Sequence, residues 1–345
     1  MKVTIVPGCE LGSDLPRVWR EMQMANPELA SPYFCPEFAQ AVATVRDDVE
    51  VAVIEEGNKT AALFAFQRSG TVGLPVGGGL SDYHGLICKP GFECDPRELI
   101  RKCGLVTWDF NHLLASQECF SPFHLEHDES PQIDLSRGFE AYASERKAVR
   151  REQIKMRRME RDIGSLRFVA HASDPGALRQ TLAWKSQQYI RTAGSDLFSL
   201  GWPRAIVETI LETQSDSFAG MLSLLYAGDR LVAGHFGMRS RTVWHWWFPS
   251  YDPAMAKYSP GLILLLKMAE HAPSVGLRTI DLGRGKMVYK DRLKNAAVPL
   301  AIGSVELPSW LSFRRTARRH LRALVLRSPF GPSARLAMRA LRRLR

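Results

Sequence analysis

Four polar side chains that can take part in proton transfer follow three consecutive glycines in the first quarter of the chain. Glycine lets the backbone approach a ligand closely, and an acid, a phenol and an imidazole in succession can bind a ligand or move its proton. A tight structural turn explains the same residues equally well, and the sequence alone leaves both explanations open. The four residues are Ser81, Asp82, Tyr83 and His84.

Two histidines and two aspartates are candidates for a general base, because each can accept a proton directly or through water. A histidine on a strand is more often a core residue whose ring nitrogens are hydrogen-bonded, so that explanation stays open for both histidines. Asp82 is favoured by its polar neighbours. The four candidates are Asp82, His235, His245 and Asp281.

The elements that must position these residues follow one another closely between residues 221 and 306. Alternating apolar residues predict strands, Asp252-Pro253 ends the third of them, and Gly261 begins an apolar helix that reaches about Ala272. The third strand has apolar residues on both faces, which predicts a central, buried position, although Trp247 and Tyr251 near its end could line a cleft. The predicted strands are 221–226, 231–239, 242–251, 278–282 and 296–306.

The start of the helix at Gly261 is a candidate phosphate site. Unpaired backbone N–H groups and the positive end of the helix dipole converge there, and a glycine allows close approach of phosphate oxygens. Most strand–loop–helix units with a glycine in the first turn bind nothing, so this pattern alone does not decide. Earlier in the chain, residues 51–54, 61–67 and 72–74 also predict strands.

The charge of the chain is concentrated at its C-terminal end. Residues 311–345 hold eleven arginines and no acidic residue, and subtracting them from the net charge of +10 leaves −1 for residues 1–310. Apolar and basic residues alternate there at helical spacing, which predicts two short basic amphipathic helices. Such helices can lie on an anionic membrane, pack on the body of the protein or bind nucleic acid; we favour the membrane and rank nucleic acid last.

A second basic run lies on a helix predicted from Phe139 to Ile163. Its acidic residues dilute the charge, so an exposed connector is the first interpretation. The alternative is that Arg151, Lys155 or Arg158 faces a cleft and contacts a phosphate.

Several classes of protein are disfavoured by the composition. No apolar run approaches the roughly 20 residues that cross a bilayer, and the first residues predict a strand rather than a signal peptide, which favours the cytoplasm or the inner face of the membrane. The six cysteines all lie within the first 119 residues without metal-ligand spacing, so we expect reduced, structural thiols. His124 and His127 lie in a polar, loop-like stretch, and no metal is predicted.

A series of short motifs, spread over residues 30–306, resembles the GNAT-type acyltransferases associated with bacterial cellulose biosynthesis (the CelD/BcsL group). The motifs are Trp184-Lys185-Ser186-Gln187-Gln188-Tyr189, Gly234-His235-Phe236-Gly237, Tyr258-Ser259-Pro260-Gly261, Asp281-Leu282-Gly283-Arg284-Gly285 followed by Tyr289-Lys290, and the earlier 31–38, 77–85 and 133–135.

The resemblance implies an α/β (α+β) fold of two tandem GNAT-like modules with mixed central sheets, as in the Fem-type peptidyltransferases, followed by a basic helical tail. The implied organisation is an N-terminal module (1–137), a basic connector helix (138–164), a C-terminal acyl-CoA-binding module (165–310) and the tail (311–345).

The resemblance also assigns roles to residues. Acyl-CoA, expected to be acetyl-CoA, is the donor, and the implied catalytic residues are Tyr289 as the acid for the departing thiolate and Lys290, with Asp82, His235 and Asp281. An ordinary half-buried tyrosine and a surface lysine remain alternatives for Tyr289 and Lys290. The implied donor-binding residues are Lys257, Tyr258, Ser259, Pro260, Gly261, Leu262, Gly283 and Gly285. The implied acceptor-binding residues are Gly79, Ser81, Tyr83, His84, Trp184, Lys185, Gln188, Trp247 and Tyr251.

The chain departs from the family pattern in the donor loop. The usual loop has Arg or Gln followed by two small residues, whereas here Lys257 precedes a single glycine and Ile263 takes the second small position. This departure puts the CoA assignment in question without removing it.

The predicted function is direct acyl transfer from acyl-CoA to an amine or a sugar hydroxyl in exopolysaccharide or cell-envelope synthesis. Direct attack on the thioester needs no Ser or Cys nucleophile, and the chain has no G-x-S-x-G motif. The alternatives are a Fem-like transferase that takes aminoacyl-tRNA, and a noncatalytic membrane-associated scaffold.

Overall fold

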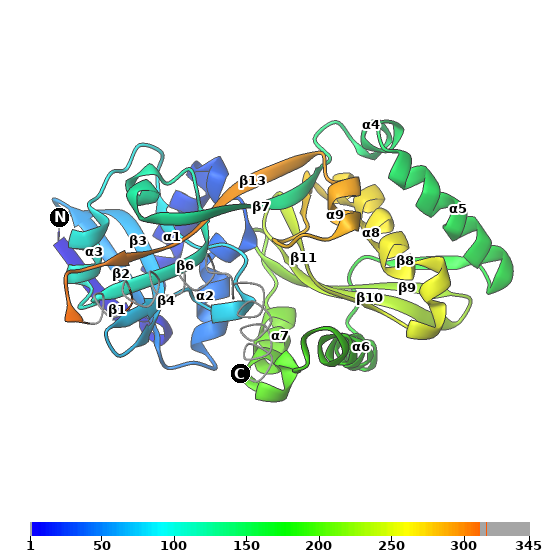
Figure 1. Cartoon of the computed structure of the whole chain (residues 1–345), viewed down its shortest axis with the longest axis horizontal. Coiled ribbons are helices and arrows are strands. Elements are labelled where there is room, and N and C mark those ends of the chain that lie inside the picture. Colours follow the sequence, from blue (N-terminus) through cyan, green and yellow to red (C-terminus); the bar gives the residue numbers. More distant parts are fainter. Residues whose placement is uncertain (1, 311–314, 316–345) are drawn as a thin grey trace, which may run out of the picture.

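The computed structural model describes residues 2–310 and residue 315 (Figure 1). Thirteen strands of the described residues form one continuous sheet in the order β1-β2-β3-β4-β6-β13-β7-β12-β11-β10-β9-β8, with β5 paired to β3. Helices cover both faces, so the predicted mixed α/β class is confirmed. The tail predicted at 311–345 lies outside the described residues except for Arg315, which forms ion pairs with Asp109 and Glu306.

The first half of the sheet is formed by strands β1 to β6. Its elements are β1 (Lys2–Pro7), α1 (Asp14–Ala25), α2 (Pro36–Ala43), β2 (Val49–Glu56), β3 (Lys59–Ser69), β4 (Val72–Leu74), the 3-10 turn η4 (Gly78–Leu80), β5 (Leu86–Cys88), α3 (Pro96–Lys102) and β6 (Thr107–Leu114).

The second half is formed by strands β8 to β12. Its elements are α4 (Phe139–Ser144), α5 (Lys147–Asp162), β8 (Leu166–Val169), α6 (Pro175–Ala193), α7 (Trp202–Glu212), β9 (Ala219–Ala227), β10 (Arg230–Arg239), β11 (Val243–Tyr251), α8 (Pro260–His271), β12 (Thr279–Asp281) and α9 (Val288–Leu293).

Two long strands, β7 (His124–Asp134) and β13 (Ala296–Glu306), join the halves. They pair with each other antiparallel, while β13 also pairs with β6 of the first half and β7 pairs with β12 of the second. Figure 1 shows both strands running through the middle of the molecule, from one half toward the other. Each half therefore contains a strand from outside its own part of the sequence.

Each half also contains one parallel strand pair among antiparallel neighbours. The pairs are β4 with β6 in the first half and β11 with β12 in the second. Strand β11 is buried on both faces, as its aromatic residues predict. Helix α8 is apolar over most of its surface and packs against β9, β10 and β11, which explains its run of buried leucines.

One apolar core extends across both halves on one sheet face and includes side chains of α1, α2, α6 and α7. The opposite face has two separate cores, one beneath α4, α5, α8 and α9 and one beneath α3. The continuous core stabilises the contact between the two halves, because its apolar side chains are fully removed from water only when the halves pack together.

Two local predictions are wrong. The helix predicted from Phe139 to Ile163 is two helices, because Arg146 has extended backbone angles (φ −119°, ψ 104°) between α4 and α5. His124 and His127 lie on strand β7 rather than in a loop. Among the described residues there is no cluster of His, Cys, Asp and Glu that could hold a metal ion, and none of their helices is long and apolar enough to span a bilayer.

Candidate active site

A cavity of about 460 Å³ opens where β11 and β12 separate. The two strands pair only as far as His245 and Asp281, but β11 continues to Tyr251, so no strand of the described residues pairs with its edge on that side from Trp246 onward. Lining residues come from both halves of the molecule: Asp82, Lys185, Gln188, Trp246, Trp247, Pro249, Ser250, Tyr251, Ala256, Ser259, Gly261, Leu262, Leu282, Gly283, Arg284, Met287, Tyr289 and Lys290.

The N-terminus of α8 forms one wall of this cavity. Ser259 precedes the helix with φ +55°, and it is the one non-glycine residue with positive φ in the part of the chain that the structure describes. The ammonium of Lys155 donates a hydrogen bond to Ser259 Oγ at 2.8 Å and is also paired with the Glu152 carboxylate at 3.1 Å, so the connector helix α5 brings an ion pair to this turn. Backbone N–H groups, a helix dipole and a lysine therefore meet at one point, an arrangement suited to an anion.

Strand β11 separates from β12 beside an irregularity in its pairing with β10. Phe236 faces Phe248 but Met238 faces His245, so β11 has an extra residue at this point. The ring of His235 braces the bulge, because its Nε2 lies 3.2 Å from the N–H of Trp247 and 3.2 Å from the carbonyl oxygen of His245. Burial lowers the pKa of His235 to about 3. His235 is therefore a neutral core residue and does not line the cavity.

His245 lies between two carboxylates. Its Nε2 is 2.9 Å from Oδ2 of Asp82, which is 163 residues away in the sequence, and its Nδ1 is 3.5 Å from Oδ1 of Asp281. Complete burial would lower the pKa of the imidazole, but hydrogen bonding and attraction to Asp281 and Asp82 raise it to about 9. At neutral pH His245 is therefore an imidazolium flanked by two aspartates.

Asp281 is completely buried and its carboxylate accepts hydrogen bonds from both halves of the sheet. Burial would raise its pKa, but His245 and the surrounding donors lower it to about 2. This saturated carboxylate holds His245 in its charged form from behind, away from the cavity. Its donors are Ser130 Oγ (2.7 Å), the Gly283 N–H (2.8 Å), Tyr83 Oη (2.6 Å) and Gln132 Nε2 (2.7 Å).

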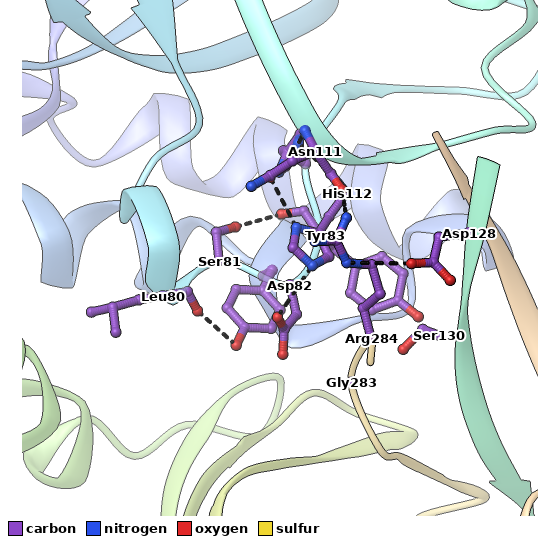
Figure 2. Close-up of polar contacts among 12 residues, drawn as sticks. Leu80, Ser81, Asp82, Tyr83, Asn111, His112, Asp128, Ser130, Gly283 and Arg284 are labelled. Carbon is purple, nitrogen blue, oxygen red and sulfur yellow. Dashed lines mark hydrogen bonds and ion pairs between the residues drawn. The ribbon is translucent and has the colours of Figure 1, made fainter. Parts of the chain in front are cut away.

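Asp82 is the carboxylate that reaches the cavity, with about a quarter of its side chain exposed. Gly283 packs directly on it: Gly283 has φ +70°, and a Cβ there would lie 2.8 Å from Asp82 Oδ2. On its other side, Nε2 of His112 is 3.6 Å from Asp82 Oδ1. Figure 2 shows Asp82 and His112 from the first half meeting Gly283 and Arg284 from the second.

Two lysines and a tyrosine complete the cavity wall. Lys290 donates hydrogen bonds to the carbonyl oxygens of Gly283 (2.9 Å) and Arg284 (3.1 Å), and burial lowers its pKa although Asp82 and Asp281 oppose the shift. Burial raises the pKa of Tyr289, which keeps its phenol protonated at neutral pH. Lys185 approaches from α6.

The structure brings about half of the predicted site residues to this cavity. Those lining it are Asp82, Lys185, Gln188, Trp247, Tyr251, Ser259, Gly261, Leu262, Gly283, Tyr289 and Lys290. The others lie elsewhere: Asp281 and Tyr83 behind His245, His235 in the core, and Gly79, Ser81, His84, Trp184, Lys257, Tyr258, Pro260 and Gly285 away from the cavity wall.

Several of the residues outside the cavity have clear structural partners. His84 Nε2 accepts the backbone N–H groups of Asn111 and His112, and burial lowers its pKa well below the usual value. Ser81 Oγ donates to the carbonyl oxygen of Tyr83. Tyr258 is buried and donates to Asp162, on α5. These contacts hold the loop and the connector helix in place.

The predicted site residues did not include Trp246, Arg284 and His112; the sequence allows Trp246 to stack on a sugar but favours the core, because aromatic residues on a buried strand are more often core. Arg284 donates to the carbonyl oxygen of Asn111 at 2.7 Å and lies 3.7 Å from Asp128, which links the two halves next to the cavity. Arg284 lies inside a recognised motif, so its sequence position gave a signal. His112 gave none, because a single histidine on an apolar strand does not stand out.

Comparison with known proteins finds a family model that matches part of the chain. Residues 143–291, which contain α5 through most of α9, match the family described as "Acetyltransferase (GNAT) domain". A search of curated proteins by sequence gave no significant match.

Solved structures share the fold of most of the chain. FemX superimposes with a TM-score of 0.60 at 8% identity, covering 92% of this chain and 99% of its own. The C-terminal domain of a putative lysylphosphatidylglycerol synthetase from Agrobacterium fabrum gives 0.55 at 11% identity, covering 90% and 95%. A tandem GNAT protein from the clavulanic acid biosynthesis pathway gives 0.50 at 11% identity, covering 89% and 100%. Residues 143–291 therefore match a GNAT acetyltransferase domain, and most of the chain shares the fold of a tandem GNAT protein.

Proposed function

We propose that this protein transfers an acyl group, acetyl in the first instance, from CoA directly to an amine or a sugar hydroxyl. The observation that carries the proposal is the open edge of β11, which lies in one cavity with the start of α8 and with the Asp82 carboxylate. GNAT domains generally use acyl-CoA donors, which makes CoA the first ligand to test.

The open edge of β11 suits the pantetheine arm of CoA. That arm is extended and has two amides, so it can lie along the open edge of β11 as an added strand would, with fewer hydrogen bonds than a full strand because Pro249 has no N–H and the Trp247 N–H is bonded to His235. The start of α8 then receives the pyrophosphate, since its N–H groups and the helix dipole supply donors and partial positive charge there, and Lys155, which is paired with Glu152, lies beside them. The single glycine of the loop does not exclude this role, because most of the donors are backbone groups.

The proposed reaction uses Asp82 as the general base and Tyr289 as the general acid. The acceptor N–H or O–H donates to the Asp82 carboxylate, which takes its proton as the nitrogen or oxygen attacks the thioester carbon. A backbone N–H of the open strand edge stabilises the oxyanion. The C–S bond then breaks, and Tyr289 protonates the departing thiolate to give free CoA. Tyr289 recovers its proton from Asp82 through water.

His245 acts as a positioning residue in this scheme. Its positive charge and its 2.9 Å contact hold Asp82 in one orientation, and Asp281 fixes the imidazolium from behind. The acceptor class, an exopolysaccharide or cell-envelope precursor, and membership of the cellulose-biosynthesis group are supported by the motif resemblance in residues 77–85 and 281–290.

The donor site is tested by calorimetric titration of acetyl-CoA into wild type, Gly261→Ala and Gly261→Asp. A Cβ at Gly261 would meet only Tyr251 Cδ1 at 3.4 Å, an ordinary contact, so both variants are expected to fold. A carboxylate against the pyrophosphate should weaken binding about tenfold, or about 1.4 kcal/mol, whereas alanine should change it little. Equal affinity of the aspartate variant and wild type would refute the loop assignment.

A Fem-like aminoacyl transfer is the second candidate. The observation that favours it is the shared fold of FemX and of the lysylphosphatidylglycerol synthetase domain. Thermal denaturation separates the two, because a ligand that binds only the native state raises the melting temperature. Stabilisation by acetyl-CoA supports the first proposal, and stabilisation only by charged tRNA would replace it with the second.

A further inference from the structure

Lys185 is a buried cation on the wall of the cavity. It lies on α6 with 8% of its surface exposed, and its ammonium lines the same space as Asp82 and Lys290. Its hydrogen-bond partners are uncharged and distant: Gln188 Oε1 and the Pro249 carbonyl oxygen are both 3.3 Å away. The ring of Tyr189 lies 5.1 Å from the ammonium.

The other cations of the cavity wall have anionic neighbours, whereas Lys185 does not. Lys290 is attracted by Asp82 and Asp281, and Arg284 lies 3.7 Å from Asp128. No carboxylate of the described residues lies within 4 Å of the Lys185 ammonium. The remaining titratable groups that act on it electrostatically, Lys290 and the buried His235, supply no negative charge.

A buried ammonium without a counter-ion is costly, because transfer from water is not repaid by a partner charge. This cost lowers the pKa of Lys185 to about 8, with burial as the larger cause and repulsion from Lys290 as the smaller one. A negative group entering the cavity would remove the cost and restore the charge. The site therefore has a strong preference for one sign of ligand charge.

We propose that Lys185 binds a phosphate or carboxylate oxygen of the bound substrate inside this cavity. The inference rests on the proposed function, since it takes the cavity as the transfer site. The anion belongs either to the phosphates of the donor or to an acidic group on the acceptor. In both cases Lys185 selects for an anionic substrate.

The test is calorimetry at pH 8.5 in two buffers of different ionisation enthalpy, which measures the protons taken up on binding. The probes are acetyl-CoA and inorganic phosphate, each alone and then phosphate with saturating acetyl-CoA. The proteins are wild type, Lys185→Met, which keeps an unbranched side chain without the charge, and Lys286→Met, an exposed lysine outside this cavity.

Wild type and Lys286→Met should take up roughly half a proton or more per bound anion, because the free amine is mostly neutral at this pH. Lys185→Met should lose this uptake and bind the probe about tenfold more weakly at pH 7. Uptake with acetyl-CoA alone assigns the anion to the donor. Uptake only when phosphate joins the acetyl-CoA complex assigns it to the acceptor.

Equal proton uptake and affinity in wild type and Lys185→Met with every probe would overturn the inference. Failure of wild type to bind acetyl-CoA would instead count against the proposed donor, and phosphate alone would then still show whether Lys185 holds an anion. Near-ultraviolet circular dichroism identical to wild type confirms that Lys185→Met is folded.

Discussion

The two halves of the molecule each contain one parallel strand pair, and among the described residues the cavity of the candidate site lies beside the pair of the second half. In the second half β11 extends well beyond β12, and the space along its free edge is open. In the first half β6 extends beyond β4, but the chain itself fills the corresponding edge. There His84 donates its N–H to the His112 carbonyl oxygen (3.1 Å) and accepts the Leu114 N–H (3.3 Å).

The segment that lies along the free edge of β6 in the first half also contacts the residues around the cavity of the second half. The residues just before His84 cross to the other half, where Asp82 contacts His245 and Tyr83 donates to Asp281. The first half, in which the edge of β6 is occupied, thus supplies the Asp82 carboxylate to the second half, in which the edge of β11 is open. Under the proposed function, the second half binds the donor and the first half supplies the group that accepts the proton.

The largest effect is expected from Asp82→Asn, which removes the one charged group that the first half contributes to the cavity. Asparagine keeps the shape but cannot accept the acceptor's proton, so turnover should fall by about 10²–10⁴ while acetyl-CoA affinity changes little. Release of free CoA in the presence of acceptor measures the rate. Turnover within threefold of wild type would show that Asp82, and with it the first half, takes no part in the chemistry.

Asp48→Asn provides a matched control for that variant. Asp48 is also a first-half carboxylate with hydrogen bonds, to Arg46 and Gln67, but it lies away from the cavity. Its loss should leave CoA release near the wild-type rate.

The second effect is a dependence of stability on pH that arises where the halves meet. The pKa of His245 is about 9 in the folded protein and about 6.5 unfolded, so its stabilisation is complete below pH 6.5 and is lost as pH rises through 9. The loss is on the order of 3 kcal/mol. Urea denaturation at pH 6 and pH 9.5 measures it.

Asp82→Asn should flatten this pH dependence, since Asp82 is one of the two carboxylates that raise the pKa of His245. Comparing the variant with wild type cancels the opposite trend of Lys185, whose lowered pKa favours the folded state as pH rises above 8. Identical slopes for both proteins would mean that Asp281 alone sets the charge of His245.

The smallest effect is expected from Gly283→Ala, which alters the contact between the halves without removing a charge. The new methyl group would meet Asp82 Oδ2 at 2.8 Å in a backbone with φ +70°, so we expect a loss of about 1–2 kcal/mol of stability and a lower rate. Gly79→Ala, on the loop of the first half, has open space and should cost less than about 0.5 kcal/mol. Thermal denaturation of both variants decides whether Asp82 must sit against Gly283.

Much of the second half could be predicted from the sequence. Alternation of apolar residues located β9, β10 and β11, and the aromatic residues on both faces of β11 indicated its central place. Asp252-Pro253 marked the end of β11, and the helix predicted to begin at Gly261 is α8, which begins one residue earlier because Pro260 fits the first helical position. Such signals are local, and they survive in a single sequence.

Local signals failed where long-range contacts decided the outcome. The break at Arg146 lies in a stretch that reads as one helix, and no glycine or proline there signals the end of α4. His124 and His127 have polar neighbours but lie on β7, because pairing with β13 satisfies that backbone. The exchange of β7 and β13 between the halves has no sequence signature, since strand pairing depends on partners far along the chain.

The sequence by itself determined the types and order of most elements of the second half and the presence of acids, histidines, lysines and tyrosines near the ends of particular strands. Only the tertiary structure decided which of them act together. His235 and His245 are both completely buried on neighbouring strands, yet the pKa of one is about 3 and that of the other about 9. The difference comes from Asp82 and Asp281, because the charge of a buried imidazole depends on carboxylates within a few ångströms rather than on its neighbours in sequence.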